Sequence, residues 1–260
     1  MKLATWNVNS LNVRLLHVLD WLRENPIDVL CLQETKQEDS KFPYDDLKTA
    51  GYNAIHAGQK TYNGVAILSK HEITDVVYGI GGFHSIADYE LEQKRVISAT
   101  INGIRVVCVY IVNGQAVDSE KYVYKLQWLE ALIYWLAGQL KQYPNLVLLG
   151  DYNIAPDDRD CHDPAAWIGQ ILVSPREREA FEKLTELGLH DSFRLFNSEG
   201  KNFTWWDYRM MGFRRNFGMR IDHILVSDAL KDKCLSCIID KAPRKLERPS
   251  DHTPVVLTLL

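Results

Sequence analysis

The chain is predicted to fold as an α/β or α+β sandwich, because short apolar runs alternate with amphipathic helical stretches from one end to the other. Its 260 residues, of which 46% are hydrophobic and 25% charged, are enough to bury the core of a two-sheet domain. No repeat, low-complexity tract or linker divides the sequence. We therefore expect a single domain over residues 1–260, or two halves fused so tightly that no linker separates them.

Eight short apolar runs have the length and the residue types of buried strands. In chain order they are LATW (3–6), DVLCL (28–32), VAIL (65–68), VISATI (96–101), RVVCVYIV (105–112), LVLLG (146–150), DHILV (222–226) and PVVLTL (254–259). They supply the strands for the two sheets of a sandwich.

Three stretches between these runs repeat their apolar residues at the spacing of an amphipathic helix. Residues 11–24 place one apolar face at Leu15, Val18, Leu19 and Leu22, and residues 120–142 place one at Leu129, Leu132, Ile133, Leu136 and Leu140. The third helix has clear end signals, since Ser174, Pro175 and Glu177 predict a capping box and Gly188 follows the last turn. Its apolar positions are Phe181, Leu184 and Leu187.

Composition gives no sign of a membrane or export signal. No run approaches eighteen consecutive apolar residues, and the first residues, MKLATWNVNS, lack the apolar centre of a signal peptide, so a cytoplasmic protein is expected. The five cysteines are odd in number, and Cys31 and Cys108 lie inside apolar runs, so disulfides are not expected. Cys234 and Cys237 form a lone C-x-x-C, which is weak support for a metal or redox role.

The net charge of −4 excludes a positive coat over the whole surface, but two local stretches are basic. Residues 202–220, NFTWWDYRMMGFRRNFGMR, carry four arginines against one aspartate, with six aromatic residues between them. Stacking surfaces beside forked cations suit nucleic acid, whereas a packed loop with solvated charge is the alternative interpretation. Residues 241–248, KAPRKLER, contain no aromatic residue, so Lys241, Arg244 and Lys245 are expected to matter less for binding.

Polar residues lie at the ends of the predicted strands. At carboxyl ends they are Asn7, Glu34, Tyr110 and Asp151, and at amino ends they are Asp222, Asp251 and His252. Strands that run in opposite directions bring both groups to one edge of the sheets, so we expect an acidic cleft there. Taken singly, each residue has a structural alternative, such as a turn-forming aspartate or an Asx turn built by Asn153 and Pro156.

The expected cleft calls for a cation. Clustered carboxylates repel one another unless a positive ion lies among them. Ligands that are rich in oxygen and lack cysteine select a hard ion. The sequence therefore predicts a site for Mg²⁺, which Mn²⁺ can replace.

Eight longer segments carry a resemblance that covers nearly the whole chain. They are TWNVNSLNVR, LCLQETK, GQKTYNGVAILSK, VYIVNG, LLGDYNIAPDDRD, TWWDY, RIDHILVS and RPSDHTPV. Their ordered set resembles the exonuclease III family of abasic-site endonucleases, within the endonuclease/exonuclease/phosphatase superfamily. The resemblance implies a four-layered αββα sandwich of two mixed β-sheets, like deoxyribonuclease I, with Mg²⁺-dependent phosphodiester cleavage at one edge.

The resemblance also implies roles for individual residues. Catalytic residues match Tyr110, the Asp151 and Asn153 of G-D-x-N, and the pair Asp222 and His252. Metal-holding residues match Asn7, Glu34, Asp151, Asn153, Asp251 and His252, with Glu34 as the central ligand. For contact with DNA we expect Asn113, Trp205, Arg214, Arg215 and Met219.

Phosphodiester hydrolysis needs an aligned water, a group that takes its proton, and stabilisation of the charge on the phosphate and on the leaving 3′ oxygen. We expect Asp151, oriented by Asn153, to activate or align the water, with His252 as the alternative base. In the first case His252, held in one tautomer by Asp222, donates to a non-bridging oxygen, with Asn7 and Tyr110 as further donors. An Asp–His pair without a nucleophilic serine motif argues against a hydrolase triad.

Three positions depart from the family pattern. Many relatives have proline at the position of Val112, some have aspartate at Asn9, and many have tryptophan at Met219, where it forms one wall of the pocket for the abasic sugar. A flexible methionine excludes an intact nucleotide less well than a rigid aromatic wall. We therefore expect substantial 3′-to-5′ exonuclease or 3′-end-cleaning activity beside abasic-site cleavage.

The expected protein is a monomeric, Mg²⁺-dependent DNA repair nuclease that acts on double-stranded DNA, 5′ to abasic sites or at 3′ ends. One alternative is a superfamily member that acts on a phosphorylated lipid or inositol, which the aromatic and arginine-rich residues 202–220 disfavour. Another is a degenerate relative that only binds nucleic acid. That alternative is disfavoured by the five retained residues Glu34, Asp151, Asn153, Asp222 and His252.

Overall fold

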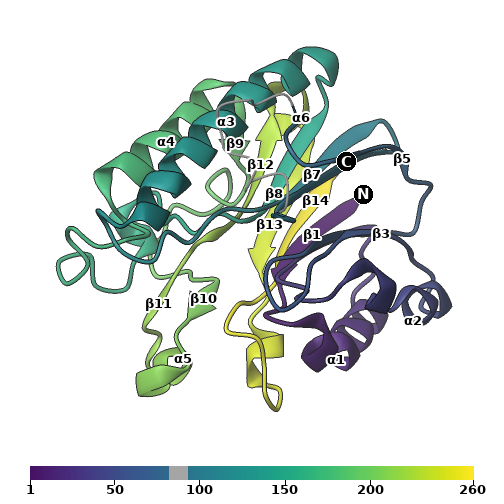
Figure 1. Ribbon diagram of the computed structural model, residues 1–260, viewed down its shortest axis with the longest axis horizontal. Helices are drawn as coiled ribbons and strands as arrows, with labels where there is room; N and C mark the ends of the chain where they lie inside the picture. Colours follow the sequence, from purple (N-terminus) through teal and green to yellow (C-terminus); the bar gives the residue numbers. More distant parts are fainter. Residues whose placement is uncertain (82–92) are drawn as a thin grey trace.

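A computed structural model describes residues 1–81 and 93–260 of the chain. Within these residues two six-stranded mixed β-sheets lie face to face, and helices cover the outer face of each sheet (Figure 1). The predicted αββα sandwich is therefore confirmed.

The first sheet has the strand order β13–β14–β1–β2–β4–β3. Its strands are β1 (Lys2–Asn7), β2 (Val29–Gln33), β3 (Asn53–Ala57), β4 (Val65–Ser69), β13 (Cys234–Ile239) and β14 (Val255–Leu259). Only β1 and β2 are parallel, and their register pairs Asn7 with Gln33. Parallel strands end at the same edge of a sheet, so Asn7 and the residue after Gln33 lie close together.

The second sheet has the strand order β5–β6–β7–β8–β12–β9. Its strands are β5 (Thr74–Tyr78), β6 (Val96–Ile101), β7 (Ile104–Tyr110), β8 (Leu146–Asp151), β9 (Leu189–Asp191) and β12 (Asp222–Ser227). The parallel register of β7 and β8 pairs Tyr110 with Asp151, and the antiparallel register of β12 and β8 pairs Asp222 with Asp151. Three predicted site residues are therefore neighbours at one sheet edge.

Four helices cover the sheets. The first sheet is covered by α1 (Leu11–Glu24) and α2 (Tyr44–Thr49), and the second by α3 (Glu120–Gln142) and α4 (Pro175–Glu186). The predicted ranges of α1 and α3 are confirmed. The capping box of α4 is present, since Ser174 and Glu177 each accept from the other's backbone N–H. Gly188 has the left-handed φ of +87° that ends this helix without a Cβ clash.

Smaller elements complete the chain. An arm at the lower edge of Figure 1 consists of a two-stranded ribbon, β10 (Trp205–Trp206) and β11 (Gly218–Met219), with α5 (Gly212–Arg215) at its tip. A further short helix is α6 (Asp228–Lys231), and 3₁₀ turns occur at 39–41, 158–160, 209–211 and 242–245. In the described part of the chain, no helix is long and apolar enough to cross a membrane.

The core explains why the strand sequences are continuously apolar. Side chains of β1 and β2 alternate between two environments, with Leu3 and Cys31 between the sheets and Ala4 and Leu30 beneath the helices of the first sheet. A strand that is buried on both faces has no polar side. The cluster between the sheets draws residues from both of them, which supports our proposal of one domain.

Three strands of regular length were not predicted, namely β3, β5 and β13. All three lie at sheet edges, where exposed residues interrupt the apolar pattern. Pairing with β14 also accounts for the C-x-x-C motif, because Cys234 and Cys237 both belong to β13. Both cysteines are free thiols, and Cys237 is buried.

Candidate active site

The predicted strand-end residues converge at one edge of the sandwich. Asn7 and Glu34 come from the ends of β1 and β2 in the first sheet, whereas Asp151 comes from the end of β8 in the second. The side-chain amide of Asn7 donates to Glu34 Oε1 at 2.9 Å and to Asp151 Oδ2 at 2.8 Å. This one amide therefore connects acidic groups of both sheets.

Three side chains lie close enough together that they could hold a metal ion. One carboxylate oxygen each from Glu34 and Asp151 and one ring nitrogen of His252 lie within 4.8 Å of one another. Over residues 1–81 and 93–260 no other group of His, Cys, Asp or Glu has this geometry. The two carboxylates suit a hard divalent cation.

Two other predicted ligands lie at the site but have different partners. The Asp251 carboxylate accepts from Asn9 Nδ2 at 2.9 Å and from Trp205 Nε1 at 3.0 Å. The Asn153 side chain accepts from Asn113 Nδ2 at 2.9 Å. These bonds orient Asp251 and Asn153, and neither residue belongs to the group of three that could hold a metal.

An aspartate–histidine pair lies beside Asp151. His252 Nδ1 and Asp222 Oδ2 are 2.9 Å apart, and His252 Nε2 lies 3.8 Å from Asp151 Oδ2. All three residues are almost fully buried. Because Asp222 occupies Nδ1, the histidine presents Nε2 to the site.

Burial and charge shift the pKa values of this group. Burial raises the pKa of Asp151 to about 7, and although the His252 charge opposes this increase, the Asp222 and Glu34 carboxylates add to it. Burial alone would lower the pKa of His252, but the Asp222 and Asp151 carboxylates outweigh it and raise that pKa to about 10. His252 is therefore a cation at neutral pH, whereas a bound metal cation would favour the Asp151 carboxylate.

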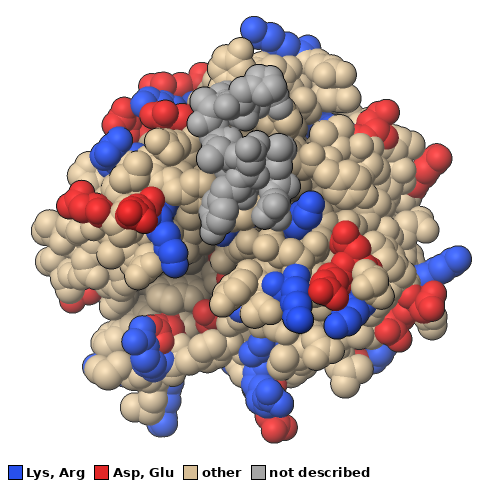
Figure 2. All heavy atoms as spheres, viewed as in Figure 1, with Lys and Arg blue, Asp and Glu red and all other residues tan. Residues whose placement is uncertain are grey.

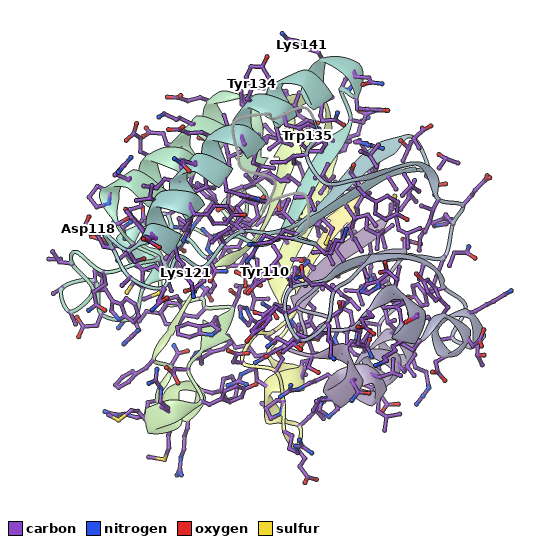
Figure 3. The ribbon with its side chains drawn as sticks, viewed as in Figure 1. Tyr110, Asp118, Lys121, Tyr134, Trp135 and Lys141 are labelled. Carbon is purple, nitrogen blue, oxygen red and sulfur yellow. The ribbon has the colours of Figure 1, made fainter. Side chains whose placement is uncertain are left out.

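Tyr110 lies at the end of β7 and opens onto a groove. Burial, and next the Glu34 carboxylate, raise the pKa of the Tyr110 phenol well above its usual value, so it remains a hydrogen-bond donor. The groove has a volume of about 1100 Å³ and is also lined by Arg95, Asn113 and Lys121. Figure 3 shows Tyr110 near the middle of this face and Lys121 on the α3 side, and Figure 2 shows a hollow there with Lys and Arg side chains along its rim.

Two residues that the sequence did not single out hold the site residues in place. Lys36 Nζ lies 2.9 Å from Glu34 Oε2 and donates to Asn9 Oδ1 at 2.6 Å. Ser250 Oγ donates to the carbonyl of Asn7 at 2.7 Å. Both occur within the segments LCLQETK and RPSDHTPV, so closeness to Glu34 and to the Asp–His pair was the signal available for them.

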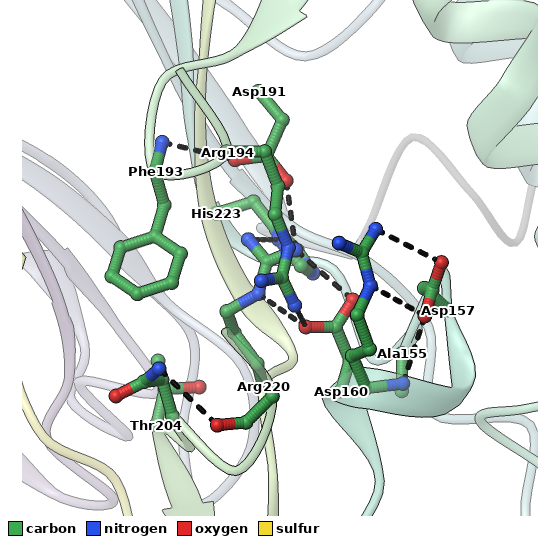
Figure 4. Close-up of polar contacts among 12 residues, drawn as sticks. Ala155, Asp157, Asp160, Asp191, Phe193, Arg194, Thr204, Arg220 and His223 are labelled. Atoms are coloured by element: carbon green, nitrogen blue, oxygen red, sulfur yellow. Dashed lines mark hydrogen bonds and ion pairs between the residues drawn. The ribbon is translucent and has the colours of Figure 1, made fainter. Parts of the chain in front are cut away.

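A buried ion network lies behind the site (Figure 4). The Arg220 guanidinium donates to the Asp160 carboxylate at 2.6 and 3.0 Å and lies 2.8 Å from Asp191 Oδ2. Burial, and next the Arg220 charge, lower the pKa of His223 to about 4, so its neutral ring accepts from Arg220 and donates to the carbonyl of Ile154. The network thus fixes the amino end of β12, which begins with Asp222, against the loop that follows Asp151 at the end of β8.

The arm places the predicted pocket residues differently from one another. Trp205 is half-buried beside the site and bonds Asp251, whereas Met219 lies opposite it in the ribbon and has no exposed surface. The Met219 side chain packs in a small apolar cluster that includes Cys161 and Leu172. Met219 therefore lies in the core behind the pocket rather than forming an open wall.

The two basic stretches also differ in the structure. Arg214 and Arg215 are exposed on α5, and the Arg215 guanidinium lies 4.1 Å from the Phe217 ring centre. Arg244 is buried, donates to the carbonyl of Ser250 and lies over the Phe213 ring at 5.0 Å, with the rings of Trp206 and Tyr208 also within 6 Å. Residues 241–248 contain no aromatic residue, but this did not predict the aromatic surroundings of Arg244, because the rings come from residues 202–220.

Comparisons with known proteins point to one family. The sequence matches the model of the endonuclease/exonuclease/phosphatase family over residues 4–252. Exodeoxyribonuclease III of Haemophilus influenzae is 34% identical, with 98% of each chain covered. Among solved structures, the 3′ phosphatase NExo from Neisseria bound to product DNA hairpin has 48% identity and a TM-score of 0.96, and an AP endonuclease from Archaeoglobus fulgidus has 40% identity and a TM-score of 0.94. Each of these two structural matches covers 100% of this chain and 99% of the other chain.

The raised pKa of Asp151 predicts a pH dependence of stability in the metal-free protein. The carboxyl titrates near pH 4 in an unfolded chain but keeps its proton up to about pH 7 in the folded site. Folding stability is therefore lost as the pH rises from about 4 to about 7. Asp151→Asn removes this effect, so in EDTA it should raise the melting temperature more at pH 8 than at pH 5.

The matched control is Asp157→Asn. A hydrogen bond from the Arg159 side chain lowers the pKa of Asp157, so this substitution should lower the melting temperature by about the same amount at pH 5 and pH 8, because Asp157 is ionised in the folded and the unfolded chain at both. Calorimetry at both pH values measures the two differences. If Asp151→Asn changed the melting temperature by the same amount at pH 5 and pH 8, the pKa of Asp151 would not be raised.

Proposed function

Because this chain belongs to the endonuclease/exonuclease/phosphatase family, and within it to the exonuclease III enzymes, we propose that it cleaves damaged duplex DNA with the residues gathered at this sheet edge. The chain is a DNA repair nuclease, and its relatives are named for activities at abasic sites and at 3′ ends. One observation carries the proposal. One carboxylate oxygen each of Glu34 and Asp151 and one ring nitrogen of His252 lie within 4.8 Å of one another, and Tyr110, the strand neighbour of Asp151, lines the groove.

The metal in this proposal is Mg²⁺, which Mn²⁺ can replace. Glu34 and Asp151 supply the oxygen ligands, and Asn7 orients both through its amide. Of the remaining predicted contributors, Asn153 and Asp251 complete the surroundings of the ion, whereas His252, with its pKa raised to about 10, faces the phosphate as a cation. When bound, the metal neutralises charge on the phosphate or on the leaving 3′ oxygen.

Asp151 is the group proposed to align the water and to take its proton. Its carboxylate is held by Asn7 and by the backbone N–H of Asn153, which donates to Asp151 Oδ1 at 2.9 Å. His252 is positively charged at neutral pH because Asp222 and Asp151 raise its pKa. A cationic imidazole donates rather than accepts, which supports Asp151 as the base and His252 as a donor to a non-bridging oxygen.

DNA is proposed to lie across the groove and the arm. Asn113 and Tyr110 line the groove, Trp205 flanks the metal site, and the exposed Arg214 and Arg215 reach phosphates from the arm. Met219 is proposed to shape the pocket from behind Trp205. We propose that the enzyme works as a monomer.

We further propose that cleavage at 3′ ends accompanies abasic-site cleavage to a substantial degree. Met219 is a flexible side chain in the apolar cluster against which Trp205 packs, so Trp205 can shift and the pocket can adjust to more than a base-less sugar. The relative of known structure that is named a 3′ phosphatase shares 48% of its sequence with this chain.

One duplex tests the proposed function. It carries an internal abasic-site analogue and a recessed 3′ end, and its products are resolved after incubation with Mg²⁺. We expect the wild type to form both products. The Asp151→Asn variant should turn over more slowly by several orders of magnitude, because the substitution removes a positioned charge while the fold is retained. Cleavage of inositol phosphates in place of DNA, or an Asp151→Asn variant as fast as the wild type, would refute the proposal.

The role of Glu34 predicts a change in metal requirement. Glu34→Ala removes an oxygen ligand, so more Mg²⁺ should be needed for half-maximal activity. The control is Glu38→Ala, whose carboxylate lies 3.6 Å from Lys41 at the surface and outside the metal group. Titration of activity with Mg²⁺ measures both variants, and a Glu34→Ala curve that overlays the wild type would exclude Glu34 as a ligand.

The exposed arginines of α5 predict the salt dependence of DNA binding. Replacing Arg214 and Arg215 by glutamine should weaken binding and reduce the slope of log K against log salt by about 1 for each phosphate that the arginines neutralise. Lys183→Gln on α4, where the lysine is paired with Glu179, serves as the control. A slope that is unchanged in the arginine variant would assign both side chains to solvated surface charge.

A further inference from the structure

A lysine with no exposed side-chain surface lies behind the proposed site. Lys125 belongs to α3, and its ammonium donates to the carbonyl of Asn153 at 2.7 Å, to the carbonyl of Asn113 at 3.2 Å and to the carboxylate of Glu177. The side chains of Lys125 and Glu177 are both 0% exposed. A buried ammonium is costly unless its donors are satisfied, and here all three partners are fixed protein oxygens.

The two carbonyls belong to residues that lie next to the reacting groups. Asn113 Nδ2 donates to Asn153 Oδ1 at 2.9 Å, so the two side chains are bonded to each other while their backbone carbonyls both accept from the same lysine. The backbone N–H of Asn153 donates to Asp151 Oδ1 at 2.9 Å. Lys125 is therefore connected to Asp151 through Asn153 without being a metal ligand itself.

The loop after β7 also rests on the stem of this lysine. Gly114 has a φ of +93°, and a Cβ at that position would lie 3.1 Å from Lys125 Cδ. The loop can therefore approach Lys125 closely because residue 114 is glycine.

We propose that Lys125 is a positioning residue for the nuclease reaction, which holds Asn113 and Asn153 in the orientation that aligns Asp151. The inference rests on the proposed function of the cleft. The competing explanation is a buried ion pair that only joins α3 to α4. The two explanations differ in what happens when both charges are removed together, because a buried pair can often be replaced by neutral groups without loss of folding.

The experiment first compares three variants of the full-length protein with Mg²⁺ and the duplex described above, and then repeats Lys125→Met in a second background. Lys125→Met removes the ammonium, and the double variant Lys125→Met with Glu177→Gln removes both charges while the glutamine keeps its acceptor oxygen. The matched control is Arg105→Met. Arg105 is a buried cation that also donates to a carbonyl, that of Asp75, but lies at the opposite end of β7 from Tyr110.

If Lys125 positions the asparagines, the double variant should fold and bind DNA with a Kd close to the wild type, while kcat falls about 10- to 100-fold. Arg105→Met should lower the melting temperature but leave kcat within about twofold of the wild type. When Asp151→Asn is already present, Lys125→Met should reduce the residual kcat by less than about threefold, because the carboxylate that Lys125 helps to align is gone.

Each other outcome rejects a specific statement. A double variant with wild-type kcat, or one that does not fold while Arg105→Met folds, would overturn the positioning role and leave Lys125 as part of a structural ion pair. An undiminished effect of Lys125→Met in the Asp151→Asn protein would overturn the alignment of Asp151 as the means by which Lys125 acts. No cleavage by the wild type would overturn the proposed function itself, and the inference with it.

Discussion

The site depends on one side-chain amide that connects the two sheets. Asn7 uses both of its amide hydrogens, one for Glu34 in the first sheet and one for Asp151 in the second. The hydrophobic effect holds the sheets together but does not fix their relative position to a fraction of an ångström. A pair of directional bonds at the open edge does so, and it sets the separation of the acidic groups that are to share a cation.

Buried cations extend this control to the segments around the cleft. Lys125 holds the loops after β7 and β8, Arg220 holds the amino end of β12, and Arg244 holds the residues before β14 against the aromatic arm. Each neutralises or satisfies carbonyls and carboxylates that would be costly to bury alone. Buried positive charges therefore position the acidic residues of the cleft. They are distinct from the exposed arginines that are proposed to contact DNA.

Local signals predicted much of this structure. Runs buried on both faces identified the central strands, and the polar residues that follow them, such as Glu34 and Asp151, marked the edge where they meet. The edge strands β5 and β13 were missed because exposure breaks their apolar pattern. Chemical roles came from the family resemblance, since a strand-end aspartate by itself is equally typical of a turn. Contacts between segments that are distant in the sequence could not be predicted from local signals. Nothing near Lys125 in the sequence indicates that Glu177 is its partner, and nothing near Met219 shows that its side chain packs toward the core.

The position of β1 between β2 and β14 has a consequence for how the protein acquires activity. A strand from the start of the chain has to wait for one from residues 255–259 before the first sheet is complete, and such distant pairings form slowly. His252 belongs to the same late segment, since it lies just before β14 in the chain. Nuclease activity therefore becomes possible only when nearly the whole chain has folded. Partly folded chains would hold an incomplete set of site residues and leave DNA intact.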